Sequence, residues 1–282
     1  MSAIRMRSPR RFSAKRIAFI FSVATLVTPA MATDSGSPLP DLSGQWGRDM
    51  LFFEPPPSGP GPVISAVRKA DGAIVARDPC CATGNPGGWL GDHINPILKP
   101  EGAAAVKRFT ELVASGTVAA DLHNSCWPEP PPFVMALHFA VNIVPRRDEV
   151  TLLYLLNNTV RRVRLNAPHP ENPTPSWQGH SVAVWASRRG GRGGAPSARY
   201  LRIATTDLLS GYLRKNGVPY GVSASLLEYV DLFQEPNGAA IIVWTAVVDD
   251  PVNLETPYII SSQFKRQPDA SGWDPTPCSA GW

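Results

Sequence analysis

The sequence predicts a mainly β fold: an antiparallel barrel or sandwich with one helix in its N-terminal half and long proline-rich loops. Short segments rich in apolar residues follow one another after residue 133, and such segments bounded by turn residues are typical of strands. Several are joined by links of hairpin length, which favours antiparallel pairing. The chain also holds 30 prolines in 282 residues, about twice the usual share of roughly 5%. Proline interrupts helices and central strands, so short strands and long loops are expected.

The expected strands can be placed from these patterns. A first strand is expected at 42–46 and a short one at 63–67, and the later strands are expected at 138–144, 150–156, 160–165, 181–185, 200–205, 226–233, 239–248 and 258–265. Asn237-Gly238 is a clear turn signal before 239–248. That strand is apolar on both faces, so we expect both faces to be covered.

A single helix is expected near 100–115. Pro100 and Glu101 provide the proline and the acid that favour a helix start. Ala105, Phe109 and Leu112 then recur at helical spacing before a glycine ends the pattern. An apolar stripe of this kind predicts a helix that packs against the core.

Residues 1–32 are expected to be a cleavable signal peptide. Six basic residues and no acid precede an apolar, uncharged run at 17–29, and small residues stand at the two positions that a signal peptidase reads in 30–32. A membrane anchor is the alternative, but the run is shorter than the about 20 residues that a spanning helix needs. The arginine pair at 10–11 makes a twin-arginine route a minor alternative. We therefore expect a periplasmic or secreted protein that begins near Thr33.

Removal of the signal changes the charge of the chain. The full chain has 27 basic and 23 acidic residues, and the mature chain keeps 21 against 23, a net charge of −2. This charge does not support nucleic-acid binding, so the arginine–glycine stretch at 188–194 is expected to be a hairpin insertion. A flexible leader at 33–41 and a single β-rich domain at 42–282 are expected. No later apolar stretch could anchor the mature protein in a membrane.

Several motifs, in order along the mature chain, resemble a broad family of exported, mostly uncharacterised bacterial proteins. They are Asp41-Leu42-Ser43-Gly44-Gln45-Trp46, Cys126-Trp127-Pro128, His169-Pro170-Glu171, Pro173-Thr174, Gly179-His180-Ser181, Trp185, Glu228, Asp250-Pro251 and Pro277-Cys278. The chain departs from that family at 188–194, where a tight turn is usual, and at Tyr220, where a histidine is frequent. The resemblance implies a fold more than an activity. Gly44-x-Trp46 also resembles the opening of lipocalin-type barrels, which favours a barrel over a sandwich.

Four cysteines form an even set, which is typical of disulfides in an oxidising compartment. The family resemblance implies that Cys126 pairs with Cys278. The adjacent Cys80 and Cys81 would then form a strained vicinal disulfide, remain free thiols or join His93 in a site for a soft metal.

The densest titratable cluster flanks a loop at 168–177 that four prolines stiffen. Its members are His169, Glu171 and His180. Two imidazoles and a carboxylate suit a metal site or general acid–base chemistry, although their spacing matches no zinc motif. The alternative is structural: His169 would bond to loop carbonyls and His180 would simply begin a strand.

Glu228 is a second candidate because it shares a strand face with apolar residues. A carboxylate in that setting must be paired, protonated or solvated in a pocket. Arg162 or Arg164 is the expected partner of an ion pair, and a role in a ligand pocket is the alternative.

The leading functional hypothesis is a periplasmic protein that binds a small apolar molecule or serves as an envelope accessory, without catalysis. The alternative is an enzyme for a hydrophobic substrate that uses acid–base or metal-assisted chemistry. No nucleotide-binding or nucleophile-elbow motif is present, and no cofactor or nucleic-acid partner is expected. The candidate catalytic residues, expected to meet at the mouth of the β domain, are His169, His180 and Glu228. The candidate ligand-binding residues are Glu171, Trp177, Trp185 and Tyr220.

Overall fold

The computed structural model describes residues 39–53, 66–68, 74–76, 91–115, 126–135, 137, 139–188, 198–214 and 216–275. All of them belong to one compact unit, Asp34–Trp282, which is distinct from Met1–Thr33. The expected signal peptide, most of the leader and residues 189–194 of the insertion lie outside the described residues.

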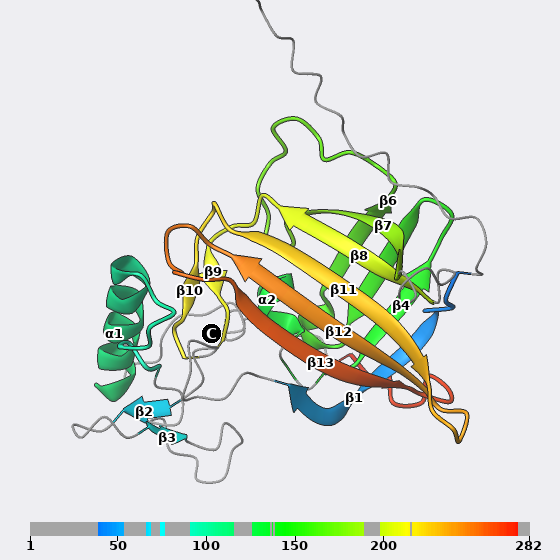
Figure 1. Ribbon diagram of the computed structural model, residues 1–282, viewed down its shortest axis with the longest axis horizontal. Coiled ribbons are helices and arrows are strands. Elements are labelled where there is room, and N and C mark those ends of the chain that lie inside the picture. Colours follow the sequence, from blue (N-terminus) through cyan, green and yellow to red (C-terminus); the bar gives the residue numbers. More distant parts are fainter. Residues whose placement is uncertain are drawn as a thin grey trace, which may run out of the picture. The chain divides into compact units, whose positions relative to one another are not determined.

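Nine strands of the described chain close into a barrel (Figure 1). Their order around the wall is β1-β13-β12-β11-β8-β7-β6-β5-β4, and β4 pairs with β1 to complete the circle. The barrel predicted from the sequence is therefore confirmed. The strands are β1 Gly44–Phe53, β4 Val141–Pro145, β5 Glu149–Tyr154, β6 Val160–Leu165, β7 His180–Arg188, β8 Ala198–Thr206, β11 Ser225–Gln234, β12 Ala240–Asp249 and β13 Tyr258–Arg266.

The wall is mixed rather than wholly antiparallel, which corrects the prediction at one pair. β6 and β7 run in the same direction, whereas the other neighbouring pairs are antiparallel. The reason is the connection at 166–179, which must carry the chain back along the wall before β7 begins. Parallel strands need such a crossover, and a short hairpin turn cannot supply it.

The helix expected near 100–115 is α1, Pro100–Ala114. The remaining elements are shorter: α2 Pro131–Val134, the 3-10 turn η2 Leu156–Asn158, and two small hairpins formed by β2 Ala66–Arg68 with β3 Ile74–Ala76 and by β9 Gly211–Tyr212 with β10 Pro219–Tyr220. Apart from β2, which overlaps the strand expected at 63–67, they span too few residues for a periodic pattern to predict them. Within the described part of the chain, no helix combines the length and the apolar character needed to span a bilayer.

Large side chains fill the interior of the barrel. Trp46, Trp244 and Phe264 are each at most 1% exposed and belong to one apolar cluster. Near the start of β1, the guanidinium of Arg266 lies over the Trp46 ring at 4.7 Å and pairs with Asp41 at 3.0 Å. This stack lies at the end of the barrel where β1 begins and β13 finishes.

The opposite end, where β5 finishes and β6 begins, is occupied by α2. All four residues of α2 are buried, and Val134 and Met135 belong to the interior cluster. Inside the wall, the Ser262 hydroxyl donates to the Met135 carbonyl at 2.9 Å. We call this region the α2 end.

A second apolar cluster joins α1 and the β9–β10 hairpin to the adjacent ends of β11, β12 and β13. Val106 of α1, Val218 beside β10 and Leu226 of β11 are among its fully buried members. Gly217 allows the close approach of α1, because a Cβ at this position would clash with the side chain of Phe109. Its φ of +80° also favours glycine.

The outer face of β12 is less covered than its sequence predicted. Ile241 is buried, but Val243 and Val247 are only half-buried, and Ile259 on neighbouring β13 is 46% exposed. The helix α1 packs on the β9–β10 hairpin rather than over this face. The expectation of cover on both faces is therefore met only in part.

Candidate functional site

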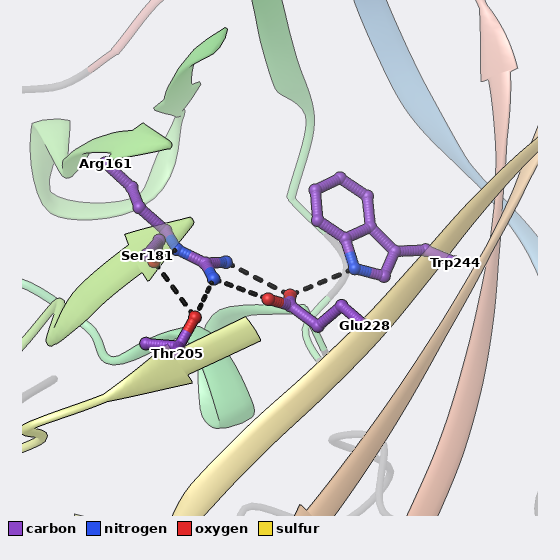
Figure 2. Close-up of polar contacts among 5 residues, drawn as sticks. All are labelled: Arg161, Ser181, Thr205, Glu228 and Trp244. Atoms are coloured by element: carbon purple, nitrogen blue, oxygen red, sulfur yellow. Dashed lines mark hydrogen bonds and ion pairs between the residues drawn. The ribbon is translucent and has the colours of Figure 1, made fainter. Parts of the chain in front are cut away.

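A fully buried ion pair crosses the interior of the barrel. Arg161 on β6 donates from Nη1 to Oε1 of Glu228 at 3.0 Å and from Nη2 to Oε2 at 2.5 Å. Both side chains have no solvent exposure. Figure 2 shows the guanidinium and the carboxylate facing each other in a fork, the geometry that suits two parallel hydrogen bonds.

Neighbouring side chains complete the hydrogen bonding of this pair. The indole Nε1 of Trp244 donates to Glu228 at 3.0 Å. Arg161 also donates from Nε to Ser181 and from Nη2 to Thr205, at 3.0 and 2.7 Å. The five residues come from five strands of the wall, so the network joins β6, β7, β8, β11 and β12 (Figure 2).

The partner of Glu228 differs from the residues that the sequence predicted. Arg162 and Arg164 are exposed, whereas Arg161 and Val163 are buried. Because side chains alternate across a strand, Arg161 is the β6 arginine that faces the interior. The expectation of an ion pair is confirmed, and its assignment to Arg162 or Arg164 is wrong.

The carboxylate keeps the buried guanidinium charged. Burial alone would lower the pKa of Arg161, but the charge of Glu228 outweighs it and raises that pKa. The charges of Arg161 and Glu228 also act on Tyr154, and burial raises the pKa of its hydroxyl to about 12. Arg161 and Tyr154 therefore keep their protons near neutral pH.

The two predicted histidines meet at the outer side of the wall. Nδ1 of His169 lies 3.2 Å from Nδ1 of His180, and their rings form an edge contact at 5.3 Å between centroids. The Thr206 hydroxyl donates to Asp207 at 2.6 Å and lies 3.3 Å from Nδ1 of His169. A hydroxyl has one hydrogen to give, so Nδ1–H of His169 is the donor toward Thr206 and His180.

Protonation of His180 is disfavoured in this position. Burial lowers the pKa of its imidazole, and the neighbouring His169 and Arg164 lower it further, whereas Asp207 acts in the opposite direction. Neutral His180 leaves Nδ1 free to accept from His169. The cluster is thus a hydrogen-bonded pair of imidazoles with an acidic neighbour.

Glu228 does not join the histidines, which corrects the expected trio. Ser181, next to His180 on β7, bonds to Arg161 inside the barrel, so His180 points outward. Glu228 points inward and its carboxylate is already bonded to Arg161 and Trp244. The wall of the barrel therefore separates the carboxylate from the imidazoles.

The predicted ligand-binding residues have different surroundings. Glu171 is exposed in the loop. Trp177 makes an edge contact with Trp127 at 5.4 Å. Trp185 packs against the interior cluster, whereas Tyr220 is buried in the second cluster. A shared ligand site for these four side chains stays a prediction.

Sequence reasoning missed a group of buried polar atoms at the α2 end. Glu129, just before α2, is 1% exposed; its N–H donates to Thr159 at 3.2 Å, and its carbonyl accepts from Nε2 of Gln178 at 2.5 Å. Burial raises the pKa of the Tyr220 hydroxyl, and the charge of Glu129 raises it further. Several buried side-chain atoms of the described chain have no hydrogen-bond partner, and the Tyr220 hydroxyl and Oε1 of Gln178 are two of them.

The sequence held one signal for this group. Glu129 stands between prolines in an uncharged run before the apolar α2, and a lone carboxylate in such a run predicts a special environment. Gln178 offered no comparable signal because amides are common in loops.

The described residues test the cysteine and metal predictions only in part. Cys126 is disulfide-bonded, and Cys80, Cys81 and Cys278 lie outside the described residues, so pairing with Cys278 stays a prediction. In the portions of the chain described above, no group of three or more His, Cys, Asp or Glu residues is arranged to hold a metal ion.

Comparison of the chain with protein-family models, curated proteins and solved structures found no match. The family resemblance of the motifs therefore stays a prediction.

Proposed function

We propose that the exported protein binds a small, largely apolar molecule at the α2 end of its barrel, without catalysis. The observation that carries this proposal is the pair of buried polar atoms without partners, on Tyr220 and Gln178. A buried polar group without a partner costs about 1–3 kcal/mol. In native proteins most buried polar groups have a hydrogen-bond partner, so these two atoms call for one, and we assign that role to a ligand.

The surroundings of these atoms favour a mainly apolar ligand. Tyr220 belongs to the cluster that contains Leu213, Val218 and Leu226, each at most 1% exposed. A site of this kind binds through apolar contact and uses a few polar groups for orientation. The Tyr220 hydroxyl can donate or accept, and Oε1 of Gln178 can only accept. The ligand class is therefore an apolar molecule with one or two hydrogen-bonding groups.

An enzyme built on His169, His180 and Glu228 has less support. General acid–base chemistry requires its groups within reach of one substrate atom. Glu228 lies inside the wall and is neutralised by Arg161, while the imidazoles bond to each other outside. A binding role needs no such convergence.

Titration of the mature protein with N-phenyl-1-naphthylamine tests the proposal. This uncharged dye is apolar, carries one N–H donor and fluoresces when it leaves water. We expect saturable binding to wild type and a dissociation constant about 2–10-fold higher for Tyr220→Phe, because the variant removes one hydrogen-bonding hydroxyl.

Tyr229→Phe is the matched control. Tyr229 is half-buried on the outer wall, where its ring lies 6.0 Å from that of Tyr200. We expect this variant to bind the dye as wild type does. Absence of saturable binding, or equal weakening by both substitutions, would contradict a site at Tyr220.

A further inference from the structure

The contact between His169 and His180 fixes the exposed half of a long loop. Residues 166–179 connect β6 to β7. Their last part is bound to the segment after β8, since Ser176 N–H donates to the Asp207 carbonyl and Leu209 N–H donates to the Ser176 carbonyl, both at 3.0 Å. The stretch 167–175 is held differently. Within it, His169 alone makes hydrogen bonds to the rest of the described chain.

We propose that His169 and His180 form a proton-operated latch that releases residues 167–175 at acidic pH. This proposal goes beyond the proposed ligand site, because it involves neither Tyr220 nor Gln178 as a binding group. Failure of the dye experiment would leave the latch untouched, and failure of the latch would leave the ligand site untouched.

The latch follows from proton counting at the two Nδ1 atoms. In the neutral pair, His169 donates and His180 accepts. A single proton on the pair still leaves one Nδ1 able to accept, so the hydrogen bond stays in place and becomes charge-assisted. A second proton must bind Nδ1 of His180 and removes the acceptor. Two N–H groups and two positive charges would then face each other across 3.2 Å, and the rings must separate.

The charges around the pair place this second step on the acid side of the ordinary histidine range. Arg164 on β6 opposes a cation on His180, and Asp207 after β8 favours one. Glu171, on the same loop, is exposed. The effects of burial and of His169 outweigh the effect of Asp207, so the pKa of His180 lies below its ordinary value of 6.5. The stability that neutral His180 contributes is therefore complete above pH 6.5 and is lost as pH falls through the folded pKa.

The released stretch is exposed at most of its positions. Pro168, Pro170, Glu171 and Asn172 are exposed, and proline keeps such a stretch extended. An exported protein meets the pH outside the cell, so the latch would change the presentation of this segment in acid.

Backbone 15N relaxation of the mature protein at pH 7.5 and pH 5.0 tests the latch. The readout is the order parameter of the Glu171, Asn172 and Thr174 amides, for which about 0.85 indicates a rigid and below about 0.6 a flexible backbone. In wild type we expect a rigid loop at pH 7.5 and a flexible loop at pH 5.0. His180→Gln retains an acceptor that does not titrate, so its loop should be rigid at both values. His169→Ala should have a flexible loop at both.

His93→Gln is the control, because His93 lies before α1, outside the loop and the imidazole pair, and it should behave as wild type does. A wild-type loop with equal order at both pH values overturns the latch. The side-chain 15N signals of wild type provide a second measurement if a variant does not fold. The midpoint of loop release must coincide with the titration of His180, and a different midpoint also overturns the proposal.

Discussion

Among single residues, Arg161 shows how a buried charge can be built into an apolar barrel. Its guanidinium is bonded to Glu228, Ser181 and Thr205. Each partner faces inward from a different strand, and Glu228 is the partner that neutralises the buried charge of Arg161. Removal of one member of a buried pair is costly because the other remains charged and desolvated.

We expect Glu228→Ala to lower the free energy of unfolding by about 3–5 kcal/mol, because Arg161 then keeps an unpaired buried charge. Urea denaturation measures the difference. Removal of both charges in Arg161→Met/Glu228→Leu should cost less than the sum of the two single substitutions, since no buried charge is left.

Glu235→Ala is the surface control for this measurement. Glu235 pairs with Lys265 at 3.7 Å, and both side chains are more than one-third exposed. Exposed pairs contribute up to about 1 kcal/mol. If Glu228→Ala costs no more than Glu235→Ala, the buried pair does not stabilise the barrel as argued.

At the level of secondary-structure elements, Asp250 organises the turn from β12 to β13. Its carboxylate accepts hydrogen bonds from the N–H groups of Gly221, Val252 and Asn253 and from the Asn253 side chain. The segment just before α1 is bound to the same turn, because Lys99 N–H donates to the Asn253 carbonyl. One carboxylate thus fixes the contact between the barrel and α1.

Asp250→Asn should lower the free energy of unfolding at pH 7 by about 1–3 kcal/mol, since charge-assisted hydrogen bonds are lost. Burial would raise the pKa of Asp250, but the hydrogen bonds from Asn253, Gly221 and Val252 outweigh burial and lower it below its ordinary value of 3.8. The charge therefore contributes fully above pH 3.8, and its contribution is lost as pH falls through the folded pKa.

Urea denaturation of wild type and Asp250→Asn at pH 7, 4 and 3 checks this sign. The difference between the two proteins should shrink toward the lowest pH. Asp249→Asn, at the exposed neighbouring position, should differ little from wild type throughout. If the difference in unfolding free energy between wild type and Asp250→Asn grows as the pH falls, the charge of Asp250 does not stabilise the turn as argued.

For the molecule as a whole, closure of the barrel depends on β1. Trp46 on β1 pairs with Val141 of β4 on one side and with Arg266 of β13 on the other. A register shift between Asp49 and Phe52 marks an irregularity where β1 continues along β13, and such bulges bend a strand. The first and last strands thus meet, and the wall has no free edge.

The proposed disulfide would act on the same scale. Cys126 lies just before α2, and its pairing with Cys278 would tie the segment at the α2 end to the C-terminal tail. Non-reducing peptide mapping of exported protein should recover the Cys126–Cys278 peptide pair. On the chain-entropy model, Cys126→Ser should cost roughly 4–5 kcal/mol. Recovery of a peptide in which Cys126 is linked to Cys80 would contradict the predicted pairing with Cys278.

Much of the fold could be predicted because it is encoded locally. The strand at 160–165 and the helix near 100–115 coincide with β6 and α1, since periodicity and turn residues act over a few positions. The contact of His169 with His180 was also predictable, because they stand 11 residues apart around a proline-stiffened loop. The shortest elements, such as α2, carry no periodic signal.

The sequence by itself determined a β-rich fold, either a barrel or a sandwich, with one packing helix. Only the tertiary structure decided which face of each strand points inward. Glu228 is 67 residues from Arg161, and β6 carries three arginines, so their pairing depends on how distant strands align. The parallel contact of β6 with β7 and the polar group around Glu129 depend on the same alignment. Strand patterns are local, whereas register and inward direction arise only when the wall closes.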